Sequence, residues 1–435
     1  KVVDLSSRHR TIDKVITDQF EQVVYSLNQP AAARNFQSIF WNCAYFDKPY
    51  FEGMFSDFVF PDGTEMQWES VSWLQKRFME WLNQERLKKI LTFPVETLNL
   101  LDDGTDYVDK EWADNAAEML SKGHSFFIYR SNSVDSLASC CRLRNEMSDN
   151  TFSYTLGAGG VATGSKGVIT INMNRLIQTA VADGRDICEA VREQVKDIHV
   201  YLKAWNAILK DEFNAKLLPI YDAGYISLDK QFLTIGINGF VEGCEFLGYT
   251  ISPDDQNYVD FTNKVLKVIY DENKADRSDG IMFNTEYVPA ENLGVKNAKW
   301  DKQDGFVVPR DCYNSYFYVV EDPTKPLDKF MLHKMTQYLD GGSALHLNLE
   351  EHLDKEQYRK LMNVAIKTGC PYWTVNVPNT ICNDCGHISK HHLHKCPKCG
   401  SENLDYATRV IGYLKRVSSF SEARQKEAAK RYYAD

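Results

Sequence analysis

The chain lacks long apolar runs. Although 43% of its 435 residues are hydrophobic, no stretch approaches the roughly 18 consecutive apolar residues that a membrane-spanning helix needs. No apolar signal segment is found either. We therefore expect a cytoplasmic protein without a membrane partner, whose hydrophobic content suffices for one large core or two ordinary ones.

Positive charge is also scarce. The chain has 50 Lys and Arg against 60 Asp and Glu, which gives a formal net charge of −10. Proteins that bind nucleic acids along the backbone use clustered Lys and Arg to neutralise phosphates. The charge balance therefore argues against a nucleic acid as a partner.

Cysteine, in contrast, is plentiful, with eleven residues. Four of them form two C-x-x-C pairs, Cys382 with Cys385 and Cys396 with Cys399. Two such pairs supply four thiolates, which can close a tetrahedral shell around Zn²⁺ with no open position. Disulfides are the competing explanation, but a long chain with many unpaired cysteines is typical of a reduced, cytosolic protein.

Histidines lie between the two cysteine pairs. They are His387, His391, His392 and His394. Any one of them could replace a cysteine as a ligand. Because the four thiolates are regularly paired, the spacing predicts a structural Cys₄ site.

A glycine motif follows the cysteines. Gly412 lies thirteen residues after Cys399, within Arg409-Val-Ile-Gly-Tyr413. Only glycine suits a residue that keeps an unpaired electron at Cα, because a side chain would crowd the planar radical and restrict the backbone. The same motif could also be an ordinary turn, with the glycine between two short strands. The cysteine pairs in front of the motif favour the radical.

The Arg-Val-x-Gly-Tyr motif resembles the radical loop of glycyl radical enzymes. With a four-cysteine cluster just upstream, the chain resembles one branch of them, the anaerobic (class III) ribonucleoside-triphosphate reductases. The resemblance implies reduction of ribonucleoside triphosphates to deoxyribonucleoside triphosphates by glycyl and thiyl radicals. It also implies an α/β fold, a ten-stranded β/α barrel made of two antiparallel halves, with a small C-terminal zinc ribbon.

The same resemblance divides the chain. We expect residues 1–370 to form the catalytic barrel, 371–404 the zinc ribbon, and 405–435 the radical loop and C-terminal tail. Relatives carry a second active-site cysteine upstream and often an ATP-binding cone, and neither motif is found here. Since the first residue is Lys1 and not methionine, we expect that an N-terminal part is missing.

Two adjacent cysteines, Cys140 and Cys141, lie in a polar segment, residues 133–145, that predicts a loop. Packing is the common fate of a cysteine, but this pair precedes Arg142 in a polar context that favours reactivity. In the reductases that the chain resembles, the thiyl cysteine lies directly before an arginine. The resemblance therefore implies Cys141 as the thiyl residue, with Cys140 as the alternative.

Further candidates come from two other segments. Pro289-Ala-Glu-Asn292 resembles a substrate-pocket signature, which implies that Glu291 holds or deprotonates a ribose hydroxyl and that Asn292 binds substrate. A solvent-exposed loop carboxylate is the ordinary alternative. The glycine-rich stretch 157–167 is followed by a strand pattern at 168–171, not by a helix, which excludes a nicotinamide fingerprint. The resemblance implies that Ser165 and Asn172 line the substrate site.

Cofactors and partners follow from the same resemblance. The chain has no C-x-x-x-C-x-x-C motif for an iron–sulfur cluster, so a separate S-adenosylmethionine-dependent activating enzyme is expected to install the radical. Formate is the expected reductant, ATP and deoxynucleoside triphosphates the effectors of the full-length protein, and a homodimer or higher even oligomer the assembly.

Two alternatives remain open from the sequence. One is a glycyl radical enzyme of the acyl lyase type, since such enzymes also carry adjacent cysteines. The other is a nucleic-acid-binding protein that uses the zinc ribbon, with Lys390, Lys395 and Lys398 as a small basic face.

The hydrophobic pattern predicts several elements. Helices are expected at 11–28, 68–90, 109–122 and through 173–213, and strands at 91–98 and 125–129. The order strand, helix, strand between residues 91 and 129 predicts a right-handed crossover in a parallel sheet.

Overall fold

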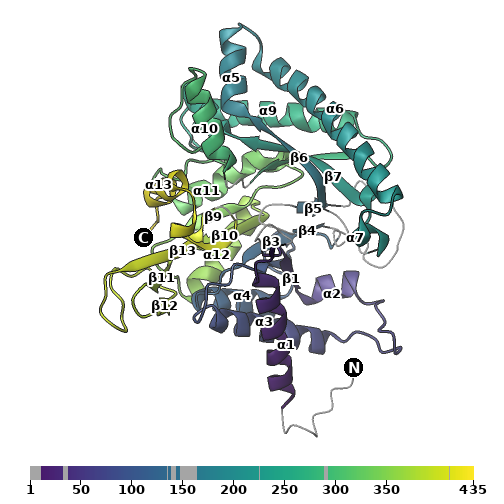
Figure 1. Ribbon diagram of the computed structural model, residues 1–435, viewed down its shortest axis with the longest axis vertical. Coiled ribbons are helices and arrows are strands. Elements are labelled where there is room, and N and C mark those ends of the chain that lie inside the picture. Colours follow the sequence, from purple (N-terminus) through teal and green to yellow (C-terminus); the bar gives the residue numbers. More distant parts are fainter. Residues whose placement is uncertain are drawn as a thin grey trace.

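The structure is a computed structural model that describes residues 11–32, 38–134, 136–138, 144–146, 164–224, 226–288, 292–410 and 412–435. Helices lie around most of the strands, while the C-terminal strands, drawn in yellow, project from one side (Figure 1). Within these residues no helix is both long enough and apolar enough to cross a membrane.

A five-stranded sheet has the order β1-β2-β3-β10-β9. Its strands are β1 (Asn42–Phe46), β2 (Val95–Leu101), β3 (Phe127–Ser131), β9 (Leu345–Asn348) and β10 (Tyr372–Asn376). The first three are parallel, and β9 and β10 are parallel to each other, but β10 runs antiparallel to β3. Two sets of parallel strands therefore meet at the β3–β10 pair.

A second, parallel sheet contains β6 (Gly164–Asn172), β7 (Gln231–Asn238) and β8 (Met282–Tyr287). A parallel bridge between Glu286 and Gly342 joins β8 to the segment before β9. The strand order is thus β1-β2-β3-β10-β9-β8-β7-β6, with one change of direction. The predicted α/β fold is confirmed. The described residues supply eight strands of this order instead of ten, and no ladder among them closes a barrel. These eight strands and the helices that cover them are called the barrel below, after the expected fold.

Helices cover the outer face of each sheet. On the five-stranded sheet α4 (Lys110–Ser121) packs against α12 (Lys355–Thr368), and on the parallel sheet α6 (Ile187–Asn214) packs against α9 (Gln256–Ala275). Trp112 of α4 and Leu98 of β2 are fully buried in the resulting core. A side chain of this kind stabilises the fold by about 1.5–3 kcal/mol when it leaves water.

The other helices of the described residues are α1 (Ile12–Asn28), α2 (Lys48–Met54), α3 (Trp68–Glu85), α5 (Met173–Ala182), α7 (Pro219–Asp222), α8 (Phe240–Phe246), α10 (Leu293–Gln303), α11 (Pro326–Leu332) and α13 (Glu422–Lys430), with the 3₁₀ helices η3 (Leu228–Lys230), η4 (His333–Tyr338) and η5 (Val417–Ser419).

Several predicted elements are confirmed. Helix α1 begins after Thr11, whose side chain accepts a hydrogen bond from the amide of Lys14, and α4 begins after Asp109 in the same way. A crossover between parallel strands is present, because β2 and β3 are parallel and α4 connects them. Its right-handedness stays a prediction.

Two predicted boundaries are wrong. The helix expected to reach residue 90 ends at Glu85, where the chain turns and the Arg86 side chain points inward to Glu96. The strand expected from residue 91 begins at Val95. Pro94 has no N–H to donate to a neighbouring strand, so the ladder starts after it.

The helical region predicted from 173 to 213 is two helices, α5 and α6. Gly184 separates them with a left-handed φ of 64°, and the Asp186 side chain caps α6. The predicted loop at 133–145 contains two short strands, β4 (Ser136–Ala138) and β5 (Arg144–Glu146), which pair antiparallel.

Candidate active site

The cysteine pairs and Gly412 lie at the ends of strands and in the connections of one small antiparallel sheet of order β12-β11-β13-β14. Its strands are β11 (Asn379–Cys382), β12 (Ile388–Ser389), β13 (Leu404–Arg409) and β14 (Leu414–Arg416). Leu404 at the start of β13 pairs with Cys382, and Arg409 at its end pairs with Leu414. The two motifs therefore occupy opposite ends of the same strand.

The four cysteine sulfurs form a compact cluster. All lie within 4.8 Å of one another, with Cys382 and Cys399 3.6 Å apart and Cys385 and Cys396 3.7 Å apart. A disulfide would require about 2.05 Å. Four sulfurs at about 2.3 Å from a tetrahedral zinc lie about 3.8 Å from one another. The donor set and its spacing are compatible with zinc.

Two of the histidines between the cysteine pairs contact carboxylates. His391 Nδ1 lies 3.1 Å from Glu351, and His392 Nδ1 lies 2.7 Å from Glu350. Among the described residues, the four cysteines are the group whose ligand atoms converge as a metal site requires. The predicted choice of thiolates over imidazoles agrees with this geometry.

Lys390 fastens this sheet to the barrel. Its buried ammonium donates to the carbonyl oxygen of Gly123 at 3.2 Å and to Oδ1 of Asn83 on α3. Burial lowers the pKa of Lys390 to about 7. This lysine, suggested above as part of a basic face, is buried among barrel residues.

Gly412 is buried in the connection between β13 and β14. The next side chain, Tyr413, packs on Phe93 and Phe40, with ring centroids 5.7 and 6.1 Å apart. It also packs against a cluster that contains Phe127 and Tyr129 of β3. These two residues alternate with Ile128, which belongs to the core beneath the helices. The connection therefore lies on the inner face of the sheet, opposite the helices.

Arg409, the last residue of β13, holds the strand that leads into this connection. Its guanidinium donates to the carbonyl oxygen of Ser125 at 2.8 Å and to the Ser125 hydroxyl, and it lies over the Phe127 ring at 5.1 Å. The side chain is buried. The arginine of the motif thus bonds the hairpin to Ser125, two residues before β3 begins.

Cys140 and Cys141 lie outside the described residues. The strands on either side of them are β4 and β5, in which Ala138 pairs with Arg144. Strand β4 also contacts β2 and β3. In the view of Figure 1 both strands are drawn between β3 and β7. The assignment of the thiyl to Cys141 remains a prediction.

Ser165 lies at the start of β6. Its hydroxyl and that of Thr234 are 2.7 Å apart, and Thr234 donates to Oδ1 of Asn284 at 2.7 Å. This chain of polar groups crosses β6, β7 and β8. Because Thr234 and Asn284 alternate with the outward-facing core residues Ile235 and Phe283, the chain runs on the inner face.

Asn172 and Asn292 lie at the other edge of the same sheet. Asn172 ends β6, caps α5 and donates to Asp301 at 2.9 Å. Asn292 precedes α10, and its side chain makes no capping bond. Asn172 lies seven positions after Ser165 on the strand, or roughly 23 Å along it, so the structure does not bring all three together. Glu291 lies outside the described residues.

The family comparison decides between the alternatives. The model of the family described as "Anaerobic ribonucleoside-triphosphate reductase" matches residues 5–433. The chain belongs to this family. It is an oxidoreductase that reduces ribonucleotides, and membership implies glycyl radical chemistry and nucleotide effectors. The comparisons give no support to an acyl lyase or to a nucleic-acid-binding protein.

Solved structures of anaerobic ribonucleotide reductases resemble this reductase closely. One described as "Anaerobic ribonucleotide reductase" is 30% identical with a TM-score of 0.85, and the match covers 97% of this chain and 68% of that one. The Thermotoga maritima enzyme in complex with dATP and CTP is 30% identical with a TM-score of 0.84, over 98% and 71% of the two chains. A search of curated proteins found no match.

The inner wall of this reductase carries polar residues that sequence analysis missed. Asn376 Nδ2 of β10 donates to Asn348 Oδ1 of β9 at 3.0 Å and lies 3.2 Å from His346 Nδ1. All three are buried. The sequence feature that could have identified them is the alternation of polar and apolar residues in His346-Leu-Asn348. This alternation places the polar side chains on one face of a strand. A polar inner wall suits a nucleotide substrate.

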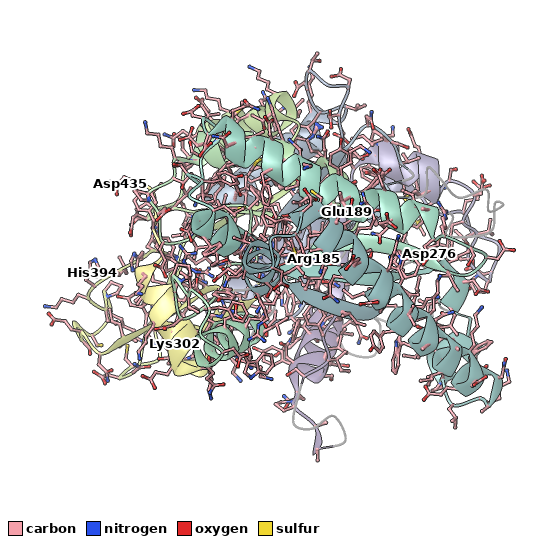
Figure 2. The ribbon with its side chains drawn as sticks, turned by 90° about the horizontal axis from the view of Figure 1, so that it is seen from above. Arg185, Glu189, Asp276, Lys302, His394 and Asp435 are labelled. Atoms are coloured by element: carbon pink, nitrogen blue, oxygen red, sulfur yellow. The ribbon has the colours of Figure 1, made fainter. Side chains whose placement is uncertain are left out.

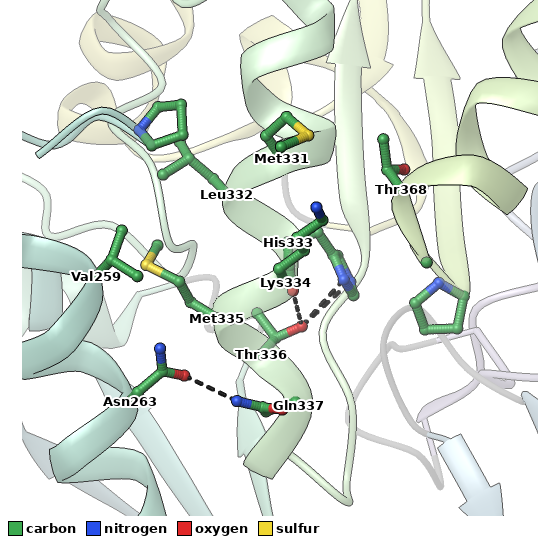
Figure 3. A pocket seen from close by; sticks show the side chains of 13 residues that line it. Val259, Asn263, Met331, Leu332, His333, Lys334, Met335, Thr336, Gln337 and Thr368 are labelled. Atoms are coloured by element: carbon green, nitrogen blue, oxygen red, sulfur yellow. Dashed lines mark hydrogen bonds between the residues drawn. The ribbon is translucent and has the colours of Figure 1, made fainter. Parts of the chain in front are cut away.

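A cavity of about 630 Å³ lies elsewhere, between α9, η4 and the turn before β10 (Figure 3). Met331, Met335 and Val259 contribute apolar surface. Two polar side chains at this cavity, Asn263 and Gln337, bond each other at 3.2 Å. None of the described candidate residues lines it.

Proposed function

We propose that this reductase acts on ribonucleoside triphosphates with Gly412 as the radical residue and Cys141 as the thiyl, Cys140 being the alternative. The observation that carries the proposal is the position of Gly412, buried at the end of a hairpin whose Tyr413 packs on the inner wall of the sheet. A carbon radical needs such shielding, because water, oxygen and stray hydrogen donors would quench it.

The reaction sequence begins at residues of the chain. The Gly412 radical takes a hydrogen atom from the Cys141 thiol, which restores glycine and leaves a thiyl, and the thiyl removes the 3′ hydrogen of the ribose. The 2′ hydroxyl then leaves as water. With formate as the reductant, one ribonucleotide, one formate and one proton give one deoxyribonucleotide, one carbon dioxide and one water. Cys141 finally returns the hydrogen to the 3′ carbon, which regenerates the thiyl.

Glu291 is proposed to hold the 3′ hydroxyl and accept its proton while the 2′ hydroxyl leaves. Asn292, directly after it, follows the carboxyl end of β8, and Asn172 is the last residue of β6. Ligands of parallel sheets bind at this edge. Ser165 lies at the opposite edge, so we propose that it contacts a different part of the substrate or the reductant.

The four cysteines are proposed to hold Zn²⁺. A closed Cys₄ site stabilises local structure and offers no position for substrate. The six residues of β13 place the cluster roughly 17 Å from the Gly412 connection. Its task is therefore to hold the base of the hairpin whose other end carries Gly412.

We place the boundary between barrel and ribbon after Asn376, in place of the boundary at residue 371 expected from the sequence. The reason is that β10 pairs with β3 and β9 of the barrel. The ribbon and the radical connection then form one unit from β11 to β14. Residues 417–435 form the tail.

The partners are also proposals. They are a separate S-adenosylmethionine-dependent activating enzyme, ATP or deoxynucleotide effectors and an even-numbered assembly. A cytoplasmic location is also proposed, and it agrees with the finding that none of the described cysteines forms a disulfide.

Electron paramagnetic resonance tests the proposal. Anaerobic protein treated with an activating enzyme, S-adenosylmethionine and a reductant should show a doublet from one α hydrogen, and Gly412→Ala should not. Gly164→Ala is the control, because its new Cβ has no neighbour closer than 3.8 Å. A doublet that persists in Gly412→Ala would refute the assignment. Labelled formate should release one carbon dioxide per deoxynucleotide.

A further inference from the structure

The C-terminal tail lies between the barrel and the hairpin that carries Gly412. After α13, the amide of Tyr432 donates to the carbonyl oxygen of Val320 at 3.0 Å. The amide of Ala434 donates to Asn348 at 2.9 Å, and Ala434 forms a parallel bridge with Leu349 after β9. Figure 2 shows the last residue, Asp435, on the same side of the molecule as His394 of the zinc ribbon. Backbone bonds therefore attach the tail to the barrel wall.

Arg431 connects this tail to the hairpin. Its Nη1 donates to the carbonyl oxygen of Arg409 at 3.0 Å, and its Nη2 donates to the carbonyl oxygen of Val410. These two carbonyls precede Gly412 by three and two residues. Since one planar guanidinium bonds both, it fixes the orientation of two successive peptide groups.

Glu427 of α13 holds the guanidinium in place. Arg431 Nε donates to Glu427 Oε1 at 2.6 Å, and Arg424 Nη1 donates to Glu427 Oε2 at 3.1 Å. All three side chains are buried. Burial opposes the charge of Arg431, but Glu427 outweighs it and raises the pKa of Arg431 above its usual value. The bonds to the two carbonyls are therefore charge-assisted, the stronger class of hydrogen bond.

We propose that Arg431 is a positioning residue that holds the Arg409–Tyr413 segment, and with it Gly412, against the inner wall of the barrel. The role in catalysis rests on the proposed radical at Gly412, but the clamp itself does not. Arg431 contacts no reacting atom. It acts through the backbone of Arg409 and Val410.

A merely structural arginine that caps α13 predicts different behaviour. Loss of such a residue would lower the melting temperature without exposing the hairpin selectively. A clamp predicts that the segment after Arg409 opens locally while the rest of the fold stays intact. Lysine is a conservative test, because it keeps the charge but cannot bond Glu427 and two carbonyls with one planar group.

The experiment compares wild type, Arg431→Lys and Arg431→Gln, with Arg359→Lys as a matched control. Arg359 bonds Asp106 and Asp114 at 2.6 and 3.1 Å, away from the hairpin. Trypsin is added to the intact, unactivated protein, and mass spectrometry follows the fragment that begins at Val410. Arg409 is buried in the wild type, so cleavage there reports local opening.

We expect cleavage after Arg409 to be about tenfold faster or more in both Arg431 variants, the effect of losing charge-assisted hydrogen bonds, and unchanged in Arg359→Lys. Equal cleavage in wild type and Arg431→Lys would overturn the proposal. Circular dichroism shows whether each variant folds. If Arg431→Gln does not fold, the comparison of wild type with Arg431→Lys, which retains the charge, decides the test.

Activated protein supplies the second readout. We expect the Arg431 variants to form the radical but to make about tenfold less deoxynucleotide per radical. Normal turnover per radical would show that Arg431 does not position Gly412. If wild type formed no radical, the proposed role of Gly412 would fail, while the trypsin result would still decide whether Arg431 holds the segment.

Discussion

The ammonium of Lys390, in the segment between the two cysteine pairs, lies 3.2 Å from the carbonyl oxygen of Gly123, at the end of a barrel helix. His352 on the barrel in turn contacts the carbonyl oxygen of Lys390 at 2.9 Å. The zinc ribbon is thus bonded to the barrel in both directions. Because the ribbon continues through β13 into the Gly412 connection, this contact fixes the base of the radical hairpin.

Lys390 should make stability depend on pH. Burial lowers its pKa from 10.5 to about 7, so between these values the unfolded chain binds the proton more strongly than the folded one. Stability from this group therefore rises as the pH rises from 7 towards 10.5, by at most about 1.4 kcal/mol per pH unit. Urea unfolding of wild type and Lys390→Met at pH 7 and pH 9 measures this contribution as the difference between their free energies of unfolding. A constant difference between the two proteins would contradict the prediction.

The metal site predicts loss of zinc on single substitution. Cys385→Ser and Cys396→Ser should reduce zinc from one per chain to nearly none, because a structural site needs all four thiolates. Cys188→Ala is the control, since Cys188 is a buried free thiol outside the cluster. Atomic absorption on purified protein gives the ratio. Full zinc in both serine variants would argue against the Cys₄ assignment.

Glu96 should be a major contributor to stability. It accepts from Arg86 at 2.5 Å and Tyr45 at 2.6 Å, with no exposed surface. Burial alone would raise its pKa, but His124 and Arg86 lower it to about 2. Glu96→Gln leaves Arg86 buried without its ionic partner and should cost about 3–5 kcal/mol.

Chemical denaturation with a surface pair as the control tests this value. Lys76 contacts the exposed Glu111 at 2.7 Å, and Glu111→Gln should change the free energy of unfolding by less than about 1 kcal/mol. If Glu96→Gln and Glu111→Gln lowered the free energy of unfolding by similar amounts, burial would not make the Glu96 ion pair more important for stability.

The different hydrogen bonds of Asn172 and Asn292 predict different effects of substitution at the two residues. Asn172→Ala removes a helix cap and a bond to Asp301, so it should lower the free energy of unfolding by about 1 kcal/mol or more. Asn292→Ala removes no capping bond. It should leave stability unchanged and raise KM for the ribonucleotide about tenfold, the value of one lost hydrogen bond. Thermal melts and steady-state kinetics separate the two outcomes.

Much of this protein follows from neighbouring residues alone. The spacing of Cys382, Cys385, Cys396 and Cys399, the motif around Gly412 and the caps of α1 and α4 depend on chemistry within a few residues. The sequence by itself therefore determined the metal-binding motif, the family and several helices. Boundaries at Pro94 and Gly184 were also within reach, because proline lacks an N–H and glycine accepts a left-handed backbone.

Only the tertiary structure decided which distant residues meet. The antiparallel pairing of β3 with β10, the burial of Lys390 beside Gly123, and the contact of Arg431 with the carbonyls of Arg409 and Val410 join segments far apart in the chain. A strand was predicted at 168–171, but not that it begins at Gly164 and places Ser165 and Asn172 at opposite edges of the sheet. Such relations depend on packing and strand order, which local propensity and residue spacing do not encode.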